Sequence, residues 1–186
     1  MRDDPLTLMG GKRMKKHYGK SILELLKKNN KGIQLDVGCG GNKQKGFVGM
    51  DIRVIDGVDI VHDIEQTPYP LPNGCCSVLL ASHIIEHICP KKLVTVVNEW
   101  WRLLKVGGQA WIAMPYGTSY GYHQDPTHCA SRNEATWLYF TPFHEAYKVY
   151  RPKPWKIIRS EWRENGNMEV VLEKMSEEEG AKCPKL

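Results

Sequence analysis

Short apolar runs alternate with polar and glycine-rich segments along the chain. Runs of four or five residues bounded by turn residues are typical of buried β-strands rather than of helices. The sequence therefore predicts five strands before residue 115. They are Ile33–Val37, Phe47–Met50, Val58–Val61, Ser77–Ala81 and Ala110–Met114.

Two helices are predicted where apolar residues recur at helical spacing. In residues 13–29, isoleucine and leucine form a stripe beside lysines, and asparagines and a glycine follow. A second helix begins at Pro90, with apolar residues at positions 93, 96, 97, 100 and 104. Gly107 and Gly108 are expected to form its left-handed C-terminal cap.

The C-terminal part of the chain has the pattern of a β-hairpin. Lys156–Glu161 and Met168–Glu173 are predicted strands, and Glu164-Asn165-Gly166-Asn167 joins them. Strands that alternate with helices imply an α/β fold with a mostly parallel sheet, whose ligands bind at the carboxyl ends of the strands.

Length and composition are those of an ordinary globular protein, and we expect residues 1–186 to form a single domain. No stretch approaches the roughly 18 apolar residues of a membrane span, and no signal peptide is apparent. The six cysteines lack paired CxxC spacing. We therefore expect reduced thiols, a cytoplasmic location and no membrane partner.

The charge is modestly basic, with 26 Lys and Arg against 21 Asp and Glu. Much of the excess falls in residues 12–20, within the first predicted helix. A solvated helix face explains this cluster most simply. A nucleic-acid footprint is the alternative.

The segment Leu35-Asp36-Val37-Gly38-Cys39-Gly40-Gly41 ends the first predicted strand in clustered glycines. Such a turn lets a ligand approach the backbone closely, and an acid within it can face an ammonium group. Asp51 follows the second strand, where a carboxylate can accept hydrogen bonds from a ribose diol. An ordinary glycine turn is the alternative interpretation.

The run from Asp36 to Gly108 resembles the class I S-adenosylmethionine-dependent methyltransferases. It carries LDVGCGG, GFVGMDI, IVHDIE, ASHIIEH and RLLKVGG in the order of that family. The resemblance implies a three-layer Rossmann-like fold with a seven-stranded sheet in the order 3-2-1-4-5-7-6. It implies S-adenosylmethionine as cofactor, S-adenosylhomocysteine as product, and no binding of nicotinamide dinucleotides.

Two departures concern the glycine loop. Asn42 stands where the family often has a third glycine, and only ten residues separate Gly40 from Asp51. A crossover helix needs a dozen residues or more, so residues 42–46 must form a bare loop or a single turn. This resembles a short-loop branch of the family, common in bacterial and phage genomes near glycan-modifying genes.

The resemblance assigns roles to matching positions. Gly38 and Gly40 pass under the cofactor, Asp36 faces its ammonium group, Asp51 holds the ribose, and Asp63 meets the adenine amino group. Ser82 and His83 lie beside the sulfonium. The full expected cofactor-binding set is Asp36, Gly38, Cys39, Gly40, Asp51, Ile52, Asp63, Ile64 and Ser82.

The segment Tyr122-His123-Gln124-Asp125-Pro126-Thr127-His128 follows the fifth strand, where the family inserts its acceptor-binding region. We divide the chain accordingly into 1–31 (helical), 32–114 (cofactor core), 115–150 (acceptor-binding) and 151–186 (hairpin and tail). His123, Asp125 and His128 are candidates for a general base and its partners. His83 is the alternative candidate for the base. An Asp-Pro turn capped by histidines is the structural alternative. Aromatic residues surround this segment: Tyr116, Tyr120, Tyr122, Trp137, Tyr139 and Phe140.

Two patterns in the sequence could bind a metal ion, although we expect no resident metal. His83-Ile84-Ile85-Glu86-His87 matches an inverted H-x-x-E-H zinc-peptidase pattern. That interpretation leaves the glycine loop and Asp51 unexplained. Alternatively, His123, Asp125 and His128 have ligand types that suit a metal.

We expect a small molecule or glycan as methyl acceptor. Ser82-His83-Ile84-Ile85 replaces the Asn/Asp-Pro-Pro-aromatic run of amino-methylating nucleic-acid enzymes. Cys75 and Cys76 precede the fourth strand, away from a cytosine-methylating nucleophile's position. A nucleic-acid methyltransferase and a non-catalytic cofactor-binding module are the alternatives. The sequence predicts no oligomeric state.

Overall fold

The structure is a computed structural model that describes residue 26 and residues 32–182. Leu26 packs against the hydrophobic core. The rest of the predicted helix 13–29, the basic cluster and Cys183 lie outside the described residues. Among the described residues, no helix is both long enough and apolar enough to cross a membrane.

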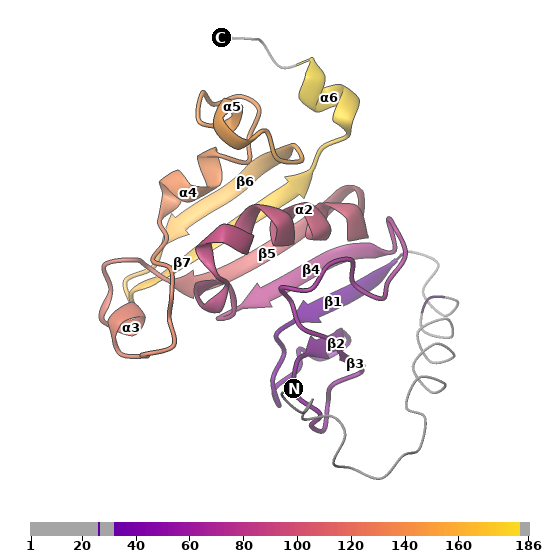
Figure 1. The fold of residues 1–186 in the computed structure, drawn as a ribbon, viewed down its shortest axis with the longest axis vertical. Helices are drawn as coiled ribbons and strands as arrows, with labels where there is room; N and C mark the ends of the chain where they lie inside the picture. The colour runs from indigo at the N-terminus through magenta and orange to yellow at the C-terminus, as the bar shows by residue number, and fades with distance from the viewer. Residues whose placement is uncertain (1–25, 27–31, 183–186) are drawn as a thin grey trace, which may run out of the picture.

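One seven-stranded sheet organises the fold, in the order β3-β2-β1-β4-β5-β7-β6 (Figure 1). The first five strands pair in parallel, whereas β7 is antiparallel to both β5 and β6. The expected fold class and strand order are therefore confirmed. The strands are β1 (Ile33–Val37), β2 (Val48–Asp51), β3 (Ile60–Val61), β4 (Cys76–Ser82), β5 (Leu104–Pro115), β6 (Trp155–Trp162) and β7 (Asn167–Lys174).

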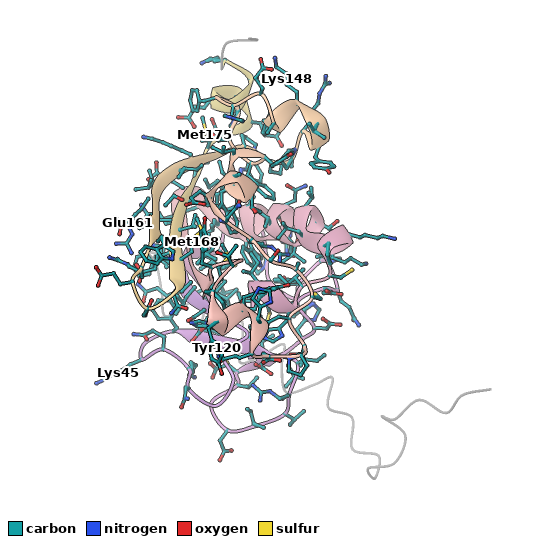
Figure 2. All side chains as sticks on the ribbon, turned by 90° about the vertical axis from the view of Figure 1, so that its left-hand side faces the viewer. Lys45, Tyr120, Lys148, Glu161, Met168 and Met175 are labelled. Carbon is teal, nitrogen blue, oxygen red and sulfur yellow. The ribbon has the colours of Figure 1, made fainter. Side chains whose placement is uncertain are left out.

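The β1–β2 connection is a helix-free loop, as its length requires. Asp36 accepts a hydrogen bond from the Gln44 amide at 2.7 Å. Lys43 forms an ion pair with Asp59 at 2.7 Å, which ties the loop to the β2–β3 connection. Asp59 also accepts from the Gly49 amide, so β3 begins only at Ile60 rather than at Val58. Lys45 projects outward from this loop (Figure 2).

The helix between β4 and β5 forms as predicted, but its expected end is wrong. A 3-10 turn, η3 (Pro90–Lys92), leads into α2 (Leu93–Leu103), and Leu104 is already extended. Gly107, at φ +74°, lies within β5, where the register to β4 shifts between Cys76 and Val78. The glycines therefore form an irregularity at the start of a strand, because the first residue after the helix already pairs with Cys76.

The remaining described helices are short. They are η2 (Ile85–His87), α3 (Tyr120–His123), α4 (Glu134–Leu138), α5 (Tyr147–Tyr150) and α6 (Glu177–Ala181). The predicted hairpin is confirmed: Gly166 adopts φ +83° in the β6–β7 turn. Because β7 runs antiparallel to β5, this turn lies at the carboxyl end of β5, where Pro115 faces Asn167.

The core lies between the central strands and α2. Leu35, Leu79 and Ala110 on β1, β4 and β5 are completely buried, and α2 contributes Val97 and Trp100. Apolar burial of this kind is the main stabilising term of a domain, and it fixes the strand ends that carry the polar side chains.

Replacing Leu79 with Ala should lower the free energy of unfolding by about 2–5 kcal/mol, because the central strand cannot close the cavity that is left. Val149→Ala, at a position that is 65% exposed, serves as the control and should change it little. Urea denaturation measures both. Equal small effects would place Leu79 outside the cooperative core.

Candidate active site

The glycine loop turns sharply after β1. Gly38 adopts φ +68° and Gly40 φ +55°. A Cβ on Gly38 would lie 2.5 Å from the Ile84 side chain, so only glycine fits there. Amides of this loop remain tied to β2: those of Gly38 and Cys39 both donate to the Met50 carbonyl.

The Asp51 carboxylate lies beside this loop at the end of β2. It is 7% exposed and accepts hydrogen bonds from the Gly40 amide at 2.9 Å and from the Arg53 amide and side chain. Burial alone would raise the pKa of Asp51, but the Arg53 and Gly40 hydrogen bonds outweigh it and lower the pKa. Asp51 is therefore held as a carboxylate.

Asp36 precedes the loop on β1, and Cys39 is part of the loop; both are buried. Burial raises the pKa of the Asp36 carboxyl, and the Gln44 amide partly offsets this. The Cys39 thiol is directed to the Gly40 carbonyl, and burial together with neighbouring carboxylates raises its pKa to about 11. At neutral pH this thiol is protonated and unreactive.

A cleft of about 180 Å³ opens at the carboxyl ends of β1, β2 and β3. Five of the nine expected cofactor residues line it, namely Gly38, Asp51, Ile52, Asp63 and Ile64. Apolar side chains of Ile84 and Ile88 complete it. Carboxylates suited to hydroxyl or amino groups thus stand beside an apolar slot suited to a flat ring. We call this the donor cleft.

The other expected cofactor residues lie around the donor cleft rather than in its lining. Gly40 is covered by Arg53, whose guanidinium would lie 2.9 Å from a Cβ at this position. Ser82 is exposed at the end of β4. His83 follows it with φ +51°, a left-handed conformation that is costly for a residue with a side chain.

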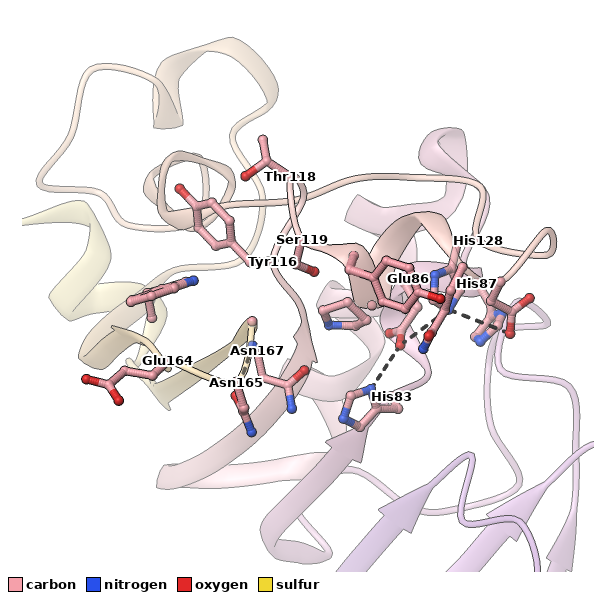
Figure 3. A pocket seen from close by; sticks show the side chains of 17 residues that line it. His83, Glu86, His87, Tyr116, Thr118, Ser119, His128, Glu164, Asn165 and Asn167 are labelled. Carbon is pink, nitrogen blue, oxygen red and sulfur yellow. Dashed lines mark hydrogen bonds and ion pairs between the residues drawn. The ribbon is translucent and has the colours of Figure 1, made fainter.

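A second cleft of about 900 Å³ lies beside the first, and we call it the acceptor cleft. It is bounded by the segment after β5, by η2 and by the β6–β7 turn (Figure 3). Tyr116, Ser119 and Tyr120 line one side, and Asn165 and Asn167 line another. His87 lines both clefts, so they meet at this side chain.

Four polar side chains gather where the clefts meet (Figure 3), namely His83, Glu86, His87 and His128. Glu86, 2% exposed, lies 3.4 Å from His83 Nδ1 and 3.9 Å from His128 Nε2. These are ion-pair distances without hydrogen-bond geometry, and neither Glu86 oxygen has a hydrogen-bond partner among the described residues. The contact with Glu86 raises the pKa of His83.

The structure brings His128 and Asp125 close but does not join them. His128 Nε2 lies 3.9 Å from Asp125, while its Nδ1 bonds the Tyr122 carbonyl at 2.7 Å. Asp125 instead accepts from Thr127 Oγ1, which lies 3.1 Å from His87 Nδ1. Thr127 Oγ1 therefore links Asp125 to His87.

Neither of the two sets of metal ligands suggested by the sequence comes together in the structure. His123 packs edge-on against Tyr122 and does not line the acceptor cleft. Residues 85–87 form a single 3-10 turn rather than the helix that the peptidase pattern needs. Within the described part of the chain, the group close enough to share an ion is Glu86, His87 and His128.

Several residues of the site were not assigned from the sequence. The hydrogen bonds from Arg53 to Asp51 and between Thr127 and His87 form only when the chain packs. The β6–β7 turn could have been placed, since the strand order 5-7-6 puts it at the carboxyl end of β5. Among the surrounding aromatics, Trp137 and Phe140 are core residues, whereas Tyr122 stacks on His128 at 5.4 Å.

Gly38→Ala should lower the free energy of unfolding by about 1–3 kcal/mol, since it combines a positive φ with a clash against Ile84. Gly41→Ala is the matched control, because nothing lies within 4 Å of its Cβ position. Chemical denaturation compares the two variants. Equal stability would mean that the loop has room for a side chain at both positions.

Comparisons with known proteins bear on this architecture. No protein-family model matches the sequence. The tRNA N(3)-cytidine methyltransferase METTL2 of Gallus gallus is 36% identical over 50 residues, which are 26% of this chain and 14% of that protein. The chain thus matches only a small part of this relative's length.

Solved structures match over most of the chain. A SAM-dependent methyltransferase from Archaeoglobus fulgidus aligns with a TM-score of 0.55 and 17% identity, covering 83% of this chain and 92% of that one. The 1,6-didemethyltoxoflavin-N1-methyltransferase of Burkholderia thailandensis, solved with S-adenosylhomocysteine, aligns with a TM-score of 0.54 and 11% identity over 86% and 79%. The chain therefore has the Rossmann-like fold of the class I methyltransferases.

Proposed function

We propose that this chain is an S-adenosylmethionine-dependent methyltransferase whose acceptor is a small molecule or a glycan. The observation that carries the proposal is the meeting of two clefts at His87, one lined by the expected cofactor residues and the other by the segment after β5. A donor and an acceptor bound in these clefts would meet beside that side chain, as in-line methyl transfer requires.

The donor cleft suits an adenosyl group. Asp51 would hold the ribose hydroxyls once Arg53 turns away, a small cost because the Arg53 side chain is 60% exposed. Ile52 and Ile64 would flank the adenine, with Asp63 near its amino group. Asp36, Gly38 and Ser82 belong to the methionine side. When bound, the sulfonium supplies an activated methyl group, so the chain's main task is positioning.

The acceptor cleft supplies groups that take up a proton. His128 is the proposed general base, and Asp125 is proposed to position the cluster through Thr127 and His87. His83 is the second candidate, since it is 49% exposed and lines the same cleft. An imidazole base contributes about 10²–10⁴-fold to a rate, less than good alignment of the reactants can.

Residues 115–150 are proposed to carry most of the acceptor contacts, and the core 32–114 most of the cofactor contacts. A reducing, cytoplasmic setting fits the free thiols among the described cysteines. A nucleic-acid acceptor is the second candidate function, favoured by the 50-residue similarity to a tRNA methyltransferase. Labelled cofactor offered with glycan, metabolite and RNA fractions tests both candidates at once.

Asp51→Ala should weaken binding of S-adenosylhomocysteine by about 1.5–3 kcal/mol, or roughly 10- to 150-fold, because charge-assisted hydrogen bonds to the ribose are lost. Calorimetry on the full chain measures this, and circular dichroism checks the fold. Asp56→Ala, on the exposed β2–β3 loop, is the control. If Asp56→Ala loses affinity and Asp51→Ala keeps it, the ribose acid has been misassigned.

His128→Ala and Asp125→Asn should each lower methyl transfer by about 10²-fold or more, as the loss of a base or of its positioning partner does. Affinity for S-adenosylhomocysteine should change little, because neither His128 nor Asp125 lines the donor cleft. Initial rates with saturating cofactor provide the measurement, and the exposed His144→Ala is the control.

Two results contradict this division of roles. Parallel loss of cofactor affinity and turnover in both variants would make the segment part of the donor cleft. Full turnover in both variants would transfer the role of base to His83.

A further inference from the structure

The proposed function leaves the Glu86 carboxylate unexplained. It is almost completely buried, and neither oxygen accepts a hydrogen bond from any described residue. Burying a polar group without a hydrogen-bond partner costs free energy. Buried carboxylates in folded proteins are therefore paired, or they coordinate a metal ion.

Two imidazoles face this carboxylate from different segments. One ligand atom each of Glu86, His87 and His128 lies within 4.8 Å of the other two. The two rings meet edge to face, with their centroids 4.7 Å apart. The Cys129 amide donates to the Glu86 carbonyl at 3.1 Å, so the loop that carries His128 is anchored to η2.

Hydrogen bonds assign the same tautomer to both rings. His128 Nδ1 must donate, because its partner is the Tyr122 carbonyl. Thr127 Oγ1 donates to Asp125, so it accepts from His87 Nδ1. The neutral His128 ring therefore has its Nε2 lone pair free, 3.9 Å from Glu86, and the His87 ring likewise keeps its Nε2 free as an acceptor. Outer hydrogen bonds of this kind are typical of metal-binding histidines, whose orientation and tautomer they fix.

We propose that Glu86, His87 and His128 bind a divalent transition-metal ion of the zinc type. Two imidazoles and one carboxylate suit Zn²⁺ or Co²⁺, whereas Mg²⁺ and Ca²⁺ prefer oxygen ligands throughout. Metal–ligand distances of about 2.0–2.2 Å require the ligand atoms to close to roughly 3.5 Å of one another. From their present separations of up to 4.8 Å, the ligand atoms would have to move about 1 Å closer together.

Neither of the basic side chains near Glu86 donates a hydrogen bond to its carboxylate. Arg132 is buried close by, but its guanidinium donates to the Ala130 and Ile88 carbonyls. His83 Nδ1 lies within ion-pair distance of Glu86 without a hydrogen bond. The proposed set differs from both sets suggested by the sequence, and it replaces our expectation of a metal-free site.

An ion at this position would leave coordination positions open toward the acceptor cleft, which all three ligands line. An acceptor oxygen could bind there. The ion would also occupy His128 Nε2, so with the ion bound the role of general base proposed for His128 would pass to His83, the second candidate. Metal binding at this site is independent of methyl transfer, and it can be measured without knowing the acceptor.

The test is titration of the EDTA-treated full chain with Zn²⁺ by calorimetry and with Co²⁺ by visible absorption. Wild type should bind one ion, and Co²⁺ should give the d–d absorption of a site with nitrogen ligands. Glu86→Gln and His128→Ala should each lower the affinity about 100-fold or more. Thr127→Val, which removes the partner of His87 Nδ1, should lower it about 10- to 100-fold.

Two histidine variants complete the design. His144→Ala removes an exposed imidazole elsewhere, and His123→Ala tests the set suggested by the sequence; both should bind Zn²⁺ as the wild type does. Absence of saturable binding in wild type overturns the proposal. So does wild-type affinity in Glu86→Gln and His128→Ala, or loss of binding in His123→Ala. S-adenosylhomocysteine titrations of the same samples separate this result from a failure of the proposed function.

Discussion

β1 pairs in parallel with β2 on one side and with β4 on the other, and this pairing determines where the chemistry of the chain is concentrated. Parallel strands end at the same edge of a sheet, so residues far apart in sequence meet there. The short β1–β2 loop depends on the same pairing. It is held by Asp36 and by the Lys43–Asp59 ion pair rather than by a crossover helix.

Two buried carboxylates at this edge have different surroundings. Asp51 has partners in Arg53 and the Gly40 amide, so its charge is stabilised before any ligand arrives. Glu86 has ion-pair contacts at 3.4 and 3.9 Å but no hydrogen bonds from described residues. A fold selected for stability alone would replace such a group with an apolar one. Asp51 thus has a hydrogen-bonded positive partner in Arg53, whereas Glu86 has none, and this difference is the basis for proposing a metal ion beside Glu86.

Local signals in the sequence predicted the strands, the hairpin and the position of Asp51, because each depends on nearby residues. The strand order came from family resemblance. The end of α2 was mispredicted since a glycine pair suits both a helix cap and a strand irregularity, and only the pairing of Leu104 with Cys76 distinguishes them. The cluster around Glu86 could not be predicted: it forms when the loop 125–129 packs on η2, forty residues away in sequence.

We propose that the donor cleft binds S-adenosylmethionine rather than a nicotinamide dinucleotide, although both ligand classes use a glycine loop after a first strand. Calorimetric titration of the full chain with S-adenosylhomocysteine and with NAD tests it most directly. We predict saturable one-site binding of S-adenosylhomocysteine and no heat from NAD. Micromolar binding of NAD without any response to S-adenosylhomocysteine would contradict the assignment.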